Sequence, residues 1–242
     1  MTPSHQTDRR AAEPGCIRKT GGLRWHARAL RHWHLHDPFR REIASFLESW
    51  QPAAKDLVLV GPSGGWFLPA TFLKRFSRLT LIELDSSAPI FFNLRHGLRL
   101  RRARTSTQWV LGDFVDYLPL LLRDSPDCAV LFCNVLGQLG LERSDYDKQL
   151  ERLPSMLAGR PWATFHDRFS AVVSSPGIPK LGIQGLVSDR PLEAELLRQP
   201  GFTGEWIDHG TGQVLPPAST RRYIPWWISP SRFHWIEVGS MH

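Results

Sequence analysis

The sequence is poor in cysteine and lysine and has no long uncharged apolar run. Three of its 242 residues are cysteines, and two of them lie in one apolar segment. So few thiols exclude a disulfide scaffold and fit a reducing compartment. No apolar run approaches the roughly 18 residues that cross a bilayer, and the arginines near the start precede no apolar core of the kind a secretory signal has. We therefore expect a cytoplasmic protein without a membrane segment.

The charge is strongly basic and is carried almost entirely by arginine. The chain has 30 basic residues, of which 25 are arginines, and a net charge of +7. Its hydrophobic content of 42% excludes wholesale disorder. Most arginines are dispersed, but Arg95–Arg104 (RHGLRLRRAR) forms a cluster. This cluster either binds RNA phosphates or is a solvated helix end, where cations are favoured.

The chain divides into three parts. Residues 1–22 are polar and contain glycine and proline, so they predict a flexible tail. Residues 23–52 predict a helical extension. Within it, Asp37 is the expected cap of a helix, Pro38 is its first residue and Pro52 ends it. Residues 53–242 predict the main domain.

In the main domain, short apolar runs alternate with helical patterns. The predicted strands are 56–60, 79–84, 109–111, 128–133 and 162–169, followed by a hairpin of 222–228 and 233–238. Helical periodicity appears around residues 67–76, 90–98 and 146–157. Alternation of this kind predicts an α/β fold with a parallel sheet and helices on both faces, and the tail adds an antiparallel hairpin.

A glycine-rich turn follows the first strand, in the segment DLVLVGPSGGW of residues 56–66. A turn between a buried strand and a helix directs backbone N–H groups and the positive helix end toward one point. No Gly-Lys-Ser/Thr follows, which excludes a phosphate-binding P-loop. The spacing also departs from the G-x-G-x-x-G pattern of dinucleotide sites.

Acidic residues follow the next two strands. Glu83 ends the second strand, where a carboxylate accepts hydrogen bonds from ribose hydroxyls; Asp85 is the alternative, unless it caps the next helix. Asp113 follows the third strand, where it would accept from an adenine amino group with Phe114 packed on the ring. A lone Gly-Asp is also common turn chemistry. The order of these features is more specific than any one of them.

With these segments the chain resembles the class I S-adenosyl-L-methionine-dependent methyltransferases. The similar pieces are VLVGPSGG, LTLIELD, VLGDF, AVLFCNVLGQL and RYIPWWISPSRFHWIEV. The resemblance implies a Rossmann-like, mostly parallel seven-stranded sheet with a C-terminal antiparallel hairpin. It also implies a lid formed by residues 23–52 over the cofactor. The cofactor-binding residues that it implies are Gly61, Pro62, Ser63, Gly64 and Gly65 for the methionine part, Glu83 for the ribose, and Asp113 with Phe114 for the adenine.

Two positions depart from the family pattern. Leu59 stands where the family usually has an acid, and Ser63 replaces the middle glycine.

A methyltransferase acting on a small molecule is the leading hypothesis. One alternative is a catalytically degenerate fold that binds RNA or a protein partner, and another is an NAD(P)-dependent oxidoreductase, which the glycine spacing disfavours.

Candidate catalytic residues lie at the ends of the fourth and fifth strands. Asn134 falls where the family has a polar residue near the transferred methyl group, so it is a candidate for both cofactor and acceptor binding. His166 is a candidate base, and Asp167 is a further catalytic candidate. Strand alternation sends these last two side chains to opposite faces, so they are not expected to act as a pair.

Three histidines, His32, His34 and His36, alternate ahead of Asp37 and raise the question of a metal site. The surrounding pattern is helical, and helical spacing spreads these rings around the axis. We therefore predict no metal site there. The ten tryptophans are expected mainly in core packing.

Overall fold

The computed structural model describes residues 22–138, 145–173, 183, 185–190, 192–198, 204–217 and 219–241. The predicted flexible tail, apart from Gly22, lies outside these residues. Within them, no helix combines the length and apolarity needed to span a membrane.

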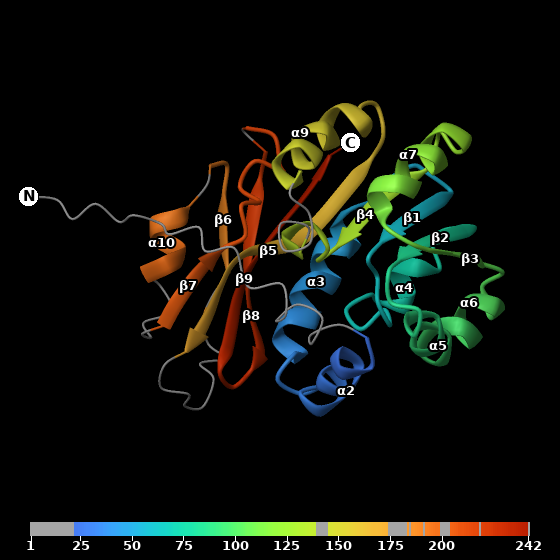
Figure 1. Cartoon of the computed structure of the whole chain (residues 1–242). Helices are drawn as coiled ribbons and strands as arrows, with labels where there is room; N and C mark the ends of the chain where they lie inside the picture. Colours follow the sequence, from blue (N-terminus) through green and yellow to red (C-terminus); the bar gives the residue numbers. More distant parts are fainter. Residues whose placement is uncertain are drawn as a thin grey trace, which may run out of the picture.

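Helices and strands alternate through the first two thirds of the chain (Figure 1). The helical elements of the described residues include α2 (Leu23–Arg31), α3 (Asp37–Ser49), α4 (Ala70–Leu73), α5 (Ala88–Phe92), the π-helix η1 (Asn93–Gly97), α6 (Leu98–Arg102), α7 (Phe114–Asp124), α9 (Tyr146–Met156) and α10 (Glu193–Arg198). The strands are β1 (Asp56–Val60), β2 (Arg78–Glu83), β3 (Ser106–Leu111), β4 (Ala129–Cys133), β5 (Trp162–Val173), β6 (Leu186–Ser188), β7 (Gly204–Asp208), β8 (Arg221–Ser229) and β9 (Arg232–Met241).

The strands form one sheet in the order β3-β2-β1-β4-β5-β9-β8-β6, and β7 also pairs with β5. Strands β1 to β5 are parallel, whereas β9 runs antiparallel to both β5 and β8. The predicted Rossmann-like α/β fold, with a mostly parallel sheet and a C-terminal antiparallel hairpin, is confirmed. The sheet has nine strands instead of the predicted seven, because the short β6 and β7 extend it beside β8 and β5.

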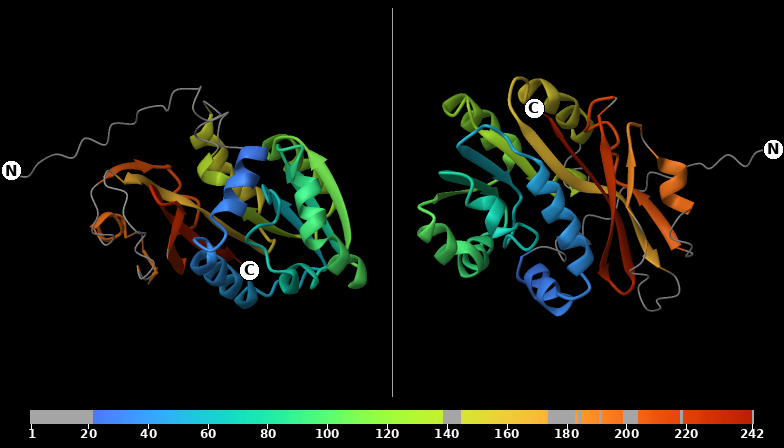
Figure 2. Two further views of the ribbon diagram at one scale, coloured as in Figure 1. Left: turned by 90° about the horizontal axis from the view of Figure 1, so that it is seen from below. Right: turned by 180° about the vertical axis from the view of Figure 1, so that it is seen from behind.

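Alternate residues of the parallel strands supply two separate apolar layers. Leu57 and Leu59 pack with α3 and α4 on one face, whereas Val58 and Val60 pack with α7 and α9 on the other. Helices therefore cover both faces, as predicted (Figure 2). A third cluster, around Trp235, joins β5, β8, β9 and α10.

Local predictions were wrong in three places. Asp37 is the first residue of α3 instead of its cap, and its carboxylate pairs with Arg40 one turn later. The helix expected around residues 67–76 is confined to α4, since Pro69 precedes it. The sequence interpretation also missed α7, which begins directly after Asp113.

Candidate functional site

The carboxyl ends of β1, β2 and β3 are joined by hydrogen bonds. Gly61 N donates to Ile82 O at 2.9 Å, and Ser63 N donates to Glu83 Oε2 at 2.7 Å. From the third strand, Gly112 N donates to Glu83 O at 2.9 Å. The structure thus brings the glycine-rich turn, Glu83 and the Gly112-Asp113 turn together at one edge of the sheet.

Glu83 is held by its own backbone surroundings. Its Oε1 accepts from Leu84 N at 2.9 Å and from Asp85 N at 3.1 Å, while Oε2 accepts from Ser63 N. Burial raises the pKa of Glu83, although these three amides favour the ionised form. An ionised carboxylate offers about four acceptor positions, so the oriented side chain retains room for a further donor.

The glycines of the turn are explained by close protein contacts. Gly61 has φ +66°, and a Cβ there would lie 2.8 Å from Val135 Cβ. Gly65 has the same φ, and a Cβ would lie 2.7 Å from His96 Nε2. Ser63 also has a positive φ, of 51°, a conformation that costs a non-glycine residue energy. The side chains of Val135 and His96 therefore pack tightly against the turn.

Helix α2 covers the turn through two of its side chains. Trp25 Nε1 donates to Ser63 Oγ at 3.1 Å. His26 accepts from Trp66 Nε1 at 2.9 Å through Nδ1, so its Nε2 carries the proton that it donates to Asp85 Oδ2 at 3.0 Å. Burial lowers the pKa of His26 despite Asp85. These contacts tie the N-terminal extension to the tips of β1 and β2.

Asp113 and Phe114 have local partners. Asp113 caps α7 by accepting from Val115 N at 3.0 Å. Phe114 is buried against Phe132, with ring centroids 5.8 Å apart. Two exposed apolar side chains that the sequence interpretation missed lie at the same strand ends: Leu84 is 59% exposed and Leu111 is 53% exposed. The sequence held a signal for both: Leu84 directly follows an apolar run, and Leu111 ends one.

Asn134 directly follows β4 with a positive φ of 55°. Its backbone N donates to Phe165 O at 2.7 Å, and its Nδ2 donates to Asp167 Oδ2 at 3.2 Å. Its Oδ1 is buried and has no hydrogen-bond partner among the described residues. A buried unpaired acceptor is costly, so this oxygen is suited to a donor supplied by a ligand.

These features fit S-adenosylmethionine better at its nucleoside half than at its methionine half. Glu83, Asp113 and the exposed Leu84 combine acceptors with an apolar surface, as a nucleoside requires. On the methionine side Leu59 is fully buried and provides no acid. The amides of Gly61, Ser63 and Gly65 already donate within the protein, which leaves Asn134 Oδ1 as the acceptor on this side. Two cavities among the described residues lie elsewhere, one beside Phe46 and Pro216 and one beside Glu48 and Arg75.

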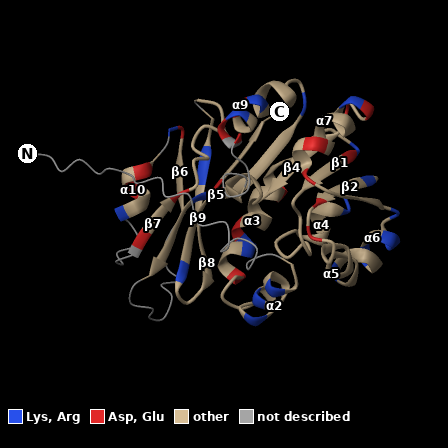
Figure 3. Cartoon of the chain, in the orientation of Figure 1, with Lys and Arg blue, Asp and Glu red and all other residues tan. Residues whose placement is uncertain are grey.

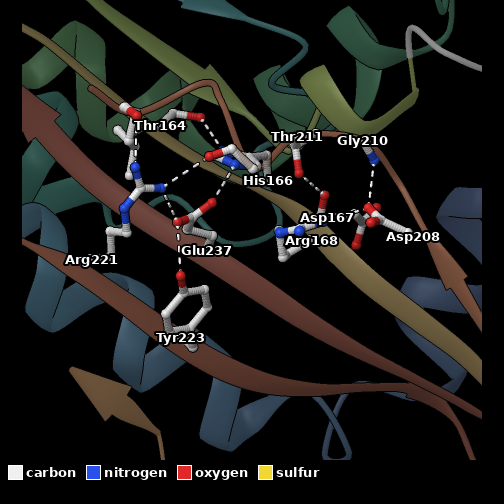
Figure 4. Close-up of polar contacts among 12 residues, drawn as sticks. Thr164, His166, Asp167, Arg168, Asp208, Gly210, Thr211, Arg221, Tyr223 and Glu237 are labelled. Carbon is white, nitrogen blue, oxygen red and sulfur yellow. Dashed lines mark hydrogen bonds and ion pairs between the residues drawn. The ribbon is translucent and has the colours of Figure 1, made fainter. Parts of the chain in front are cut away.

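His166 lies on the opposite face of the sheet from Asp167. It is fully buried, its Nδ1 lies 3.0 Å from Thr164 Oγ1 and its Nε2 lies 3.2 Å from Glu237 Oε2 (Figure 4). Arg221 Nη1 donates to Glu237 Oε1 at 2.6 Å, and Tyr223 donates to the same oxygen at 3.1 Å. This arrangement gives His166 a structural role in a closed polar network.

A second acidic-histidine arrangement was missed by the sequence interpretation. Asp167 Oδ1 lies 2.6 Å from His234 Nδ1, and the ring of His209 is stacked beside that of His234. Asp167, His209 and His234 are close enough to be considered as ligands of one ion. They lie up to 67 positions apart in the sequence, so only the sheet register brings them together.

The N-terminal histidines do not form such a group among the described residues. His34 is exposed, whereas His36 is buried and bonds Ile228 O through Nε2. In the arginine cluster, Arg95 lies over the Trp33 ring at 4.7 Å. The arginines of α6 are exposed, and Figure 3 shows in blue where basic residues lie on this helix.

Solved structures similar to this chain include methyltransferases. The N-methyltransferase NodS from Bradyrhizobium japonicum WM9, in complex with S-adenosyl-L-homocysteine, is 16% identical over 86% of this chain and 91% of that chain, with a TM-score of 0.45. The glycopeptide N-methyltransferase MtfA is 13% identical over 82% and 89%, with a TM-score of 0.42. The N-terminal domain of EvdMO1 with SAH bound is 16% identical over 87% and 84%, also at 0.42. No protein-family model and no curated protein matches the sequence.

Proposed function

We propose that the protein is an S-adenosylmethionine-dependent methyltransferase that acts on a small molecule. The observation that carries this proposal is the junction at Glu83, which receives hydrogen bonds from the turn after β1 and from the turn after β3. Open α/β sheets bind ligands at the carboxyl ends of their strands. The fold and an oriented carboxylate therefore support the same location for a nucleoside.

The bound cofactor supplies an electrophilic methyl group, and the chain positions it. Glu83 binds the ribose hydroxyls, and Asp113 with Leu84 and Leu111 binds the adenine. The backbone of the turn from Gly61 to Gly65 and Asn134 Oδ1 border the amino-acid part, which supplies an ammonium donor for that buried oxygen. Positioning and exclusion of water then provide much of the rate enhancement.

The N-terminal extension serves as a lid in this proposal. Trp25 and His26 bond to the turn and to Asp85 from above. Because α2 covers the site, it opens for the cofactor to enter and closes over it afterwards. Closure also keeps water from the reacting groups.

RNA remains the second candidate ligand because of the exposed surface of η1 and α6. Arg99, Arg101 and Arg102 are exposed there beside Leu94 and Leu98. An RNA-binding protein would show affinity that falls steeply with salt. Tight, salt-sensitive RNA binding without binding of S-adenosylhomocysteine would favour this candidate.

Isothermal titration with S-adenosylhomocysteine tests the proposal. The native protein binds with measurable heat, and Glu83→Gln weakens binding about 10- to 150-fold, because a hydrogen bond to a charged group contributes roughly 1.5–3 kcal/mol. The exposed Asp124→Asn is the matched control and binds normally. Unchanged urea denaturation confirms that the Glu83 variant is folded. Absence of heat with the native protein at millimolar ligand contradicts the proposal.

A further inference from the structure

The Asp167–His234 pair joins β5 to β9 at the edge of the sheet that bears Asn134. Asp167 is 4% exposed and His234 is 9% exposed. The Oδ1 to Nδ1 distance of 2.6 Å makes this a short, charge-assisted hydrogen bond. Since these strands form the centre of the C-terminal half, the pair is rigidly placed.

The hydrogen bond defines the form of the imidazole. A carboxylate only accepts, so His234 Nδ1 carries the proton and donates it. In the neutral ring Nε2 then has a free lone pair. Among the described residues His234 makes no second hydrogen bond. Its Nε2 has no partner there and is not fully buried. The ring therefore presents a proton acceptor that a ligand can reach.

The carboxylate is itself anchored on its other side. Asn134 Nδ2 donates to Asp167 Oδ2 at 3.2 Å, and Thr211 Oγ1 donates to the Asp167 carbonyl at 2.8 Å. Burial raises the pKa of Asp167, but His234, His209 and Asn134 together hold it below its ordinary value. Asp167 therefore stays ionised and keeps the ring in one orientation.

The same geometry disfavours a metal ion. His209 Nδ1 lies 3.1 Å from Gly137 O and Nε2 lies 2.9 Å from Ser170 Oγ, so both of its ring nitrogens have partners. An ion bound at about 2.0–2.2 Å from each ligand would replace the hydrogen bond between Asp167 and His234. All contacts of the pair are already consistent with a proton in that position.

Aromatic side chains connect His234 to the glycine-rich turn. The Trp226 ring lies 5.6 Å from the His234 ring and 6.1 Å from the Trp25 ring, and Trp25 bonds Ser63. Asn134 adds a second connection, because the next residue, Val135, packs against Gly61. The base position is therefore connected to the turn by two routes, one through Trp226 and Trp25 and one through Asp167 and Asn134.

We propose that His234 is the general base of methyl transfer and that Asp167 and Asn134 are positioning residues. The acceptor is then a group that must lose a proton, a hydroxyl or an ammonium. For a hydroxyl, Nε2 takes the proton while an oxygen lone pair forms the bond to the methyl carbon. For an ammonium, Nε2 takes the proton first, and the nitrogen lone pair that this frees then forms the bond. In both cases the electrons of the broken carbon–sulfur bond remain on sulfur. This inference rests on the proposed function.

Nitrogen-15 NMR of the full chain tests the proton position without any acceptor. With His234 assigned by the signal lost in His234→Gln, long-range spectra at pH 8 show the proton on Nδ1 and none on Nε2. Asp167→Asn removes that preference. Diethyl pyrocarbonate, followed by peptide mass spectrometry, modifies His234 and leaves the fully buried His166 unmodified. A proton on Nε2, or an unreactive His234, overturns the inference.

Methyl transfer from tritium-labelled S-adenosylmethionine to a phenol, a primary alcohol and a primary amine tests the role. His234→Gln lowers transfer to the probe that is used by about 10²- to 10⁴-fold, with unchanged affinity for S-adenosylhomocysteine. The matched control His34→Gln, which alters an exposed histidine, leaves both unchanged.

Transfer by His234→Gln at the native rate overturns the role of this residue, as does stoichiometric Zn²⁺ binding that the variant loses. If the native protein methylates none of the three probes, the NMR and modification results decide whether the assignment of His234 as the base stands. Failure of the native protein to bind S-adenosylhomocysteine contradicts the proposed function instead, and is measured separately from the proton position.

Discussion

The two halves of the sheet are built from different chemistry. In the parallel half, β1 and β4 are buried almost entirely through apolar side chains, and the charged residues of β1 to β4 lie at the strand ends. In the antiparallel half, which begins where β9 pairs with β5, the strands bury Arg221, Glu237 and His166 within 3% exposure. The parallel half is stabilised by apolar burial and carries the proposed cofactor site, whereas the antiparallel half depends on paired charges and carries the proposed base.

Breaking one pair in the antiparallel half gives the largest expected change in stability. Glu237→Gln leaves the Arg221 guanidinium buried without its counter-charge. Removing one partner of a buried ion pair costs about 3–5 kcal/mol. Urea denaturation at pH 7 measures this loss in the free energy of unfolding.

The double variant Glu237→Leu with Arg221→Met sharpens the interpretation. It removes both charges, so its stability returns toward that of the native protein. If Glu237→Gln alone is as stable as the native protein, buried charge pairing does not distinguish the two halves.

Acid sensitivity comes next, and two buried histidines cause it. Burial lowers the pKa of His36 and of His96 to about 4, against about 6.5 in the unfolded chain. Between these values the unfolded chain binds more protons, so stability falls as the pH drops from 6.5 toward 4. Each residue contributes on the order of 3 kcal/mol to this loss.

Denaturation at pH 7 and at pH 4.5 tests this account with His36→Gln. The variant loses less stability between the two pH values than the native protein does. The exposed His34→Gln is the control and keeps the native pH dependence. An equal loss in His36→Gln and in the native protein would show that His36 does not titrate in this range.

The smallest effect is expected at the contact between the extension and the parallel half. Trp25→Phe removes the hydrogen bond to Ser63 Oγ and keeps most of the apolar ring. A hydrogen bond of about 1 kcal/mol then no longer opposes opening, and S-adenosylhomocysteine associates roughly fivefold faster in stopped-flow fluorescence. The exposed Leu30→Ala on the same helix is the control, and an association rate unchanged by Trp25→Phe argues against a lid.

The apolar half was the more predictable of the two. Strand 56–60 was predicted at its observed bounds, and CAVLFC identified β4, because continuous apolar runs directly reflect burial on both faces. Glu83 and Asp113 were identifiable since each follows such a run, and parallel strands bring their ends together. What the structure adds to that prediction is the hydrogen bond from Ser63 N to the Glu83 carboxylate.

The polar half was not predictable from local pattern. His234 lies in an aromatic strand with no motif around it, and its partner Asp167 is set by the register of β5 against β9, with a bulge between Asp167 and Phe169. His166 was a reasonable candidate base by residue type, but only the structure shows Glu237 opposite it. Long-range register therefore decides which polar residues face a site and which are buried in pairs.

Hydrogen–deuterium exchange with and without S-adenosylhomocysteine locates the cofactor site within the sheet, because it reports each half separately. We predict slower exchange in peptides that contain Gly61–Gly65, Glu83–Asp85 and Leu111–Val115, and little change in β7. Unchanged exchange at these three strand tips under saturating ligand, or protection confined to the antiparallel half, would contradict this prediction.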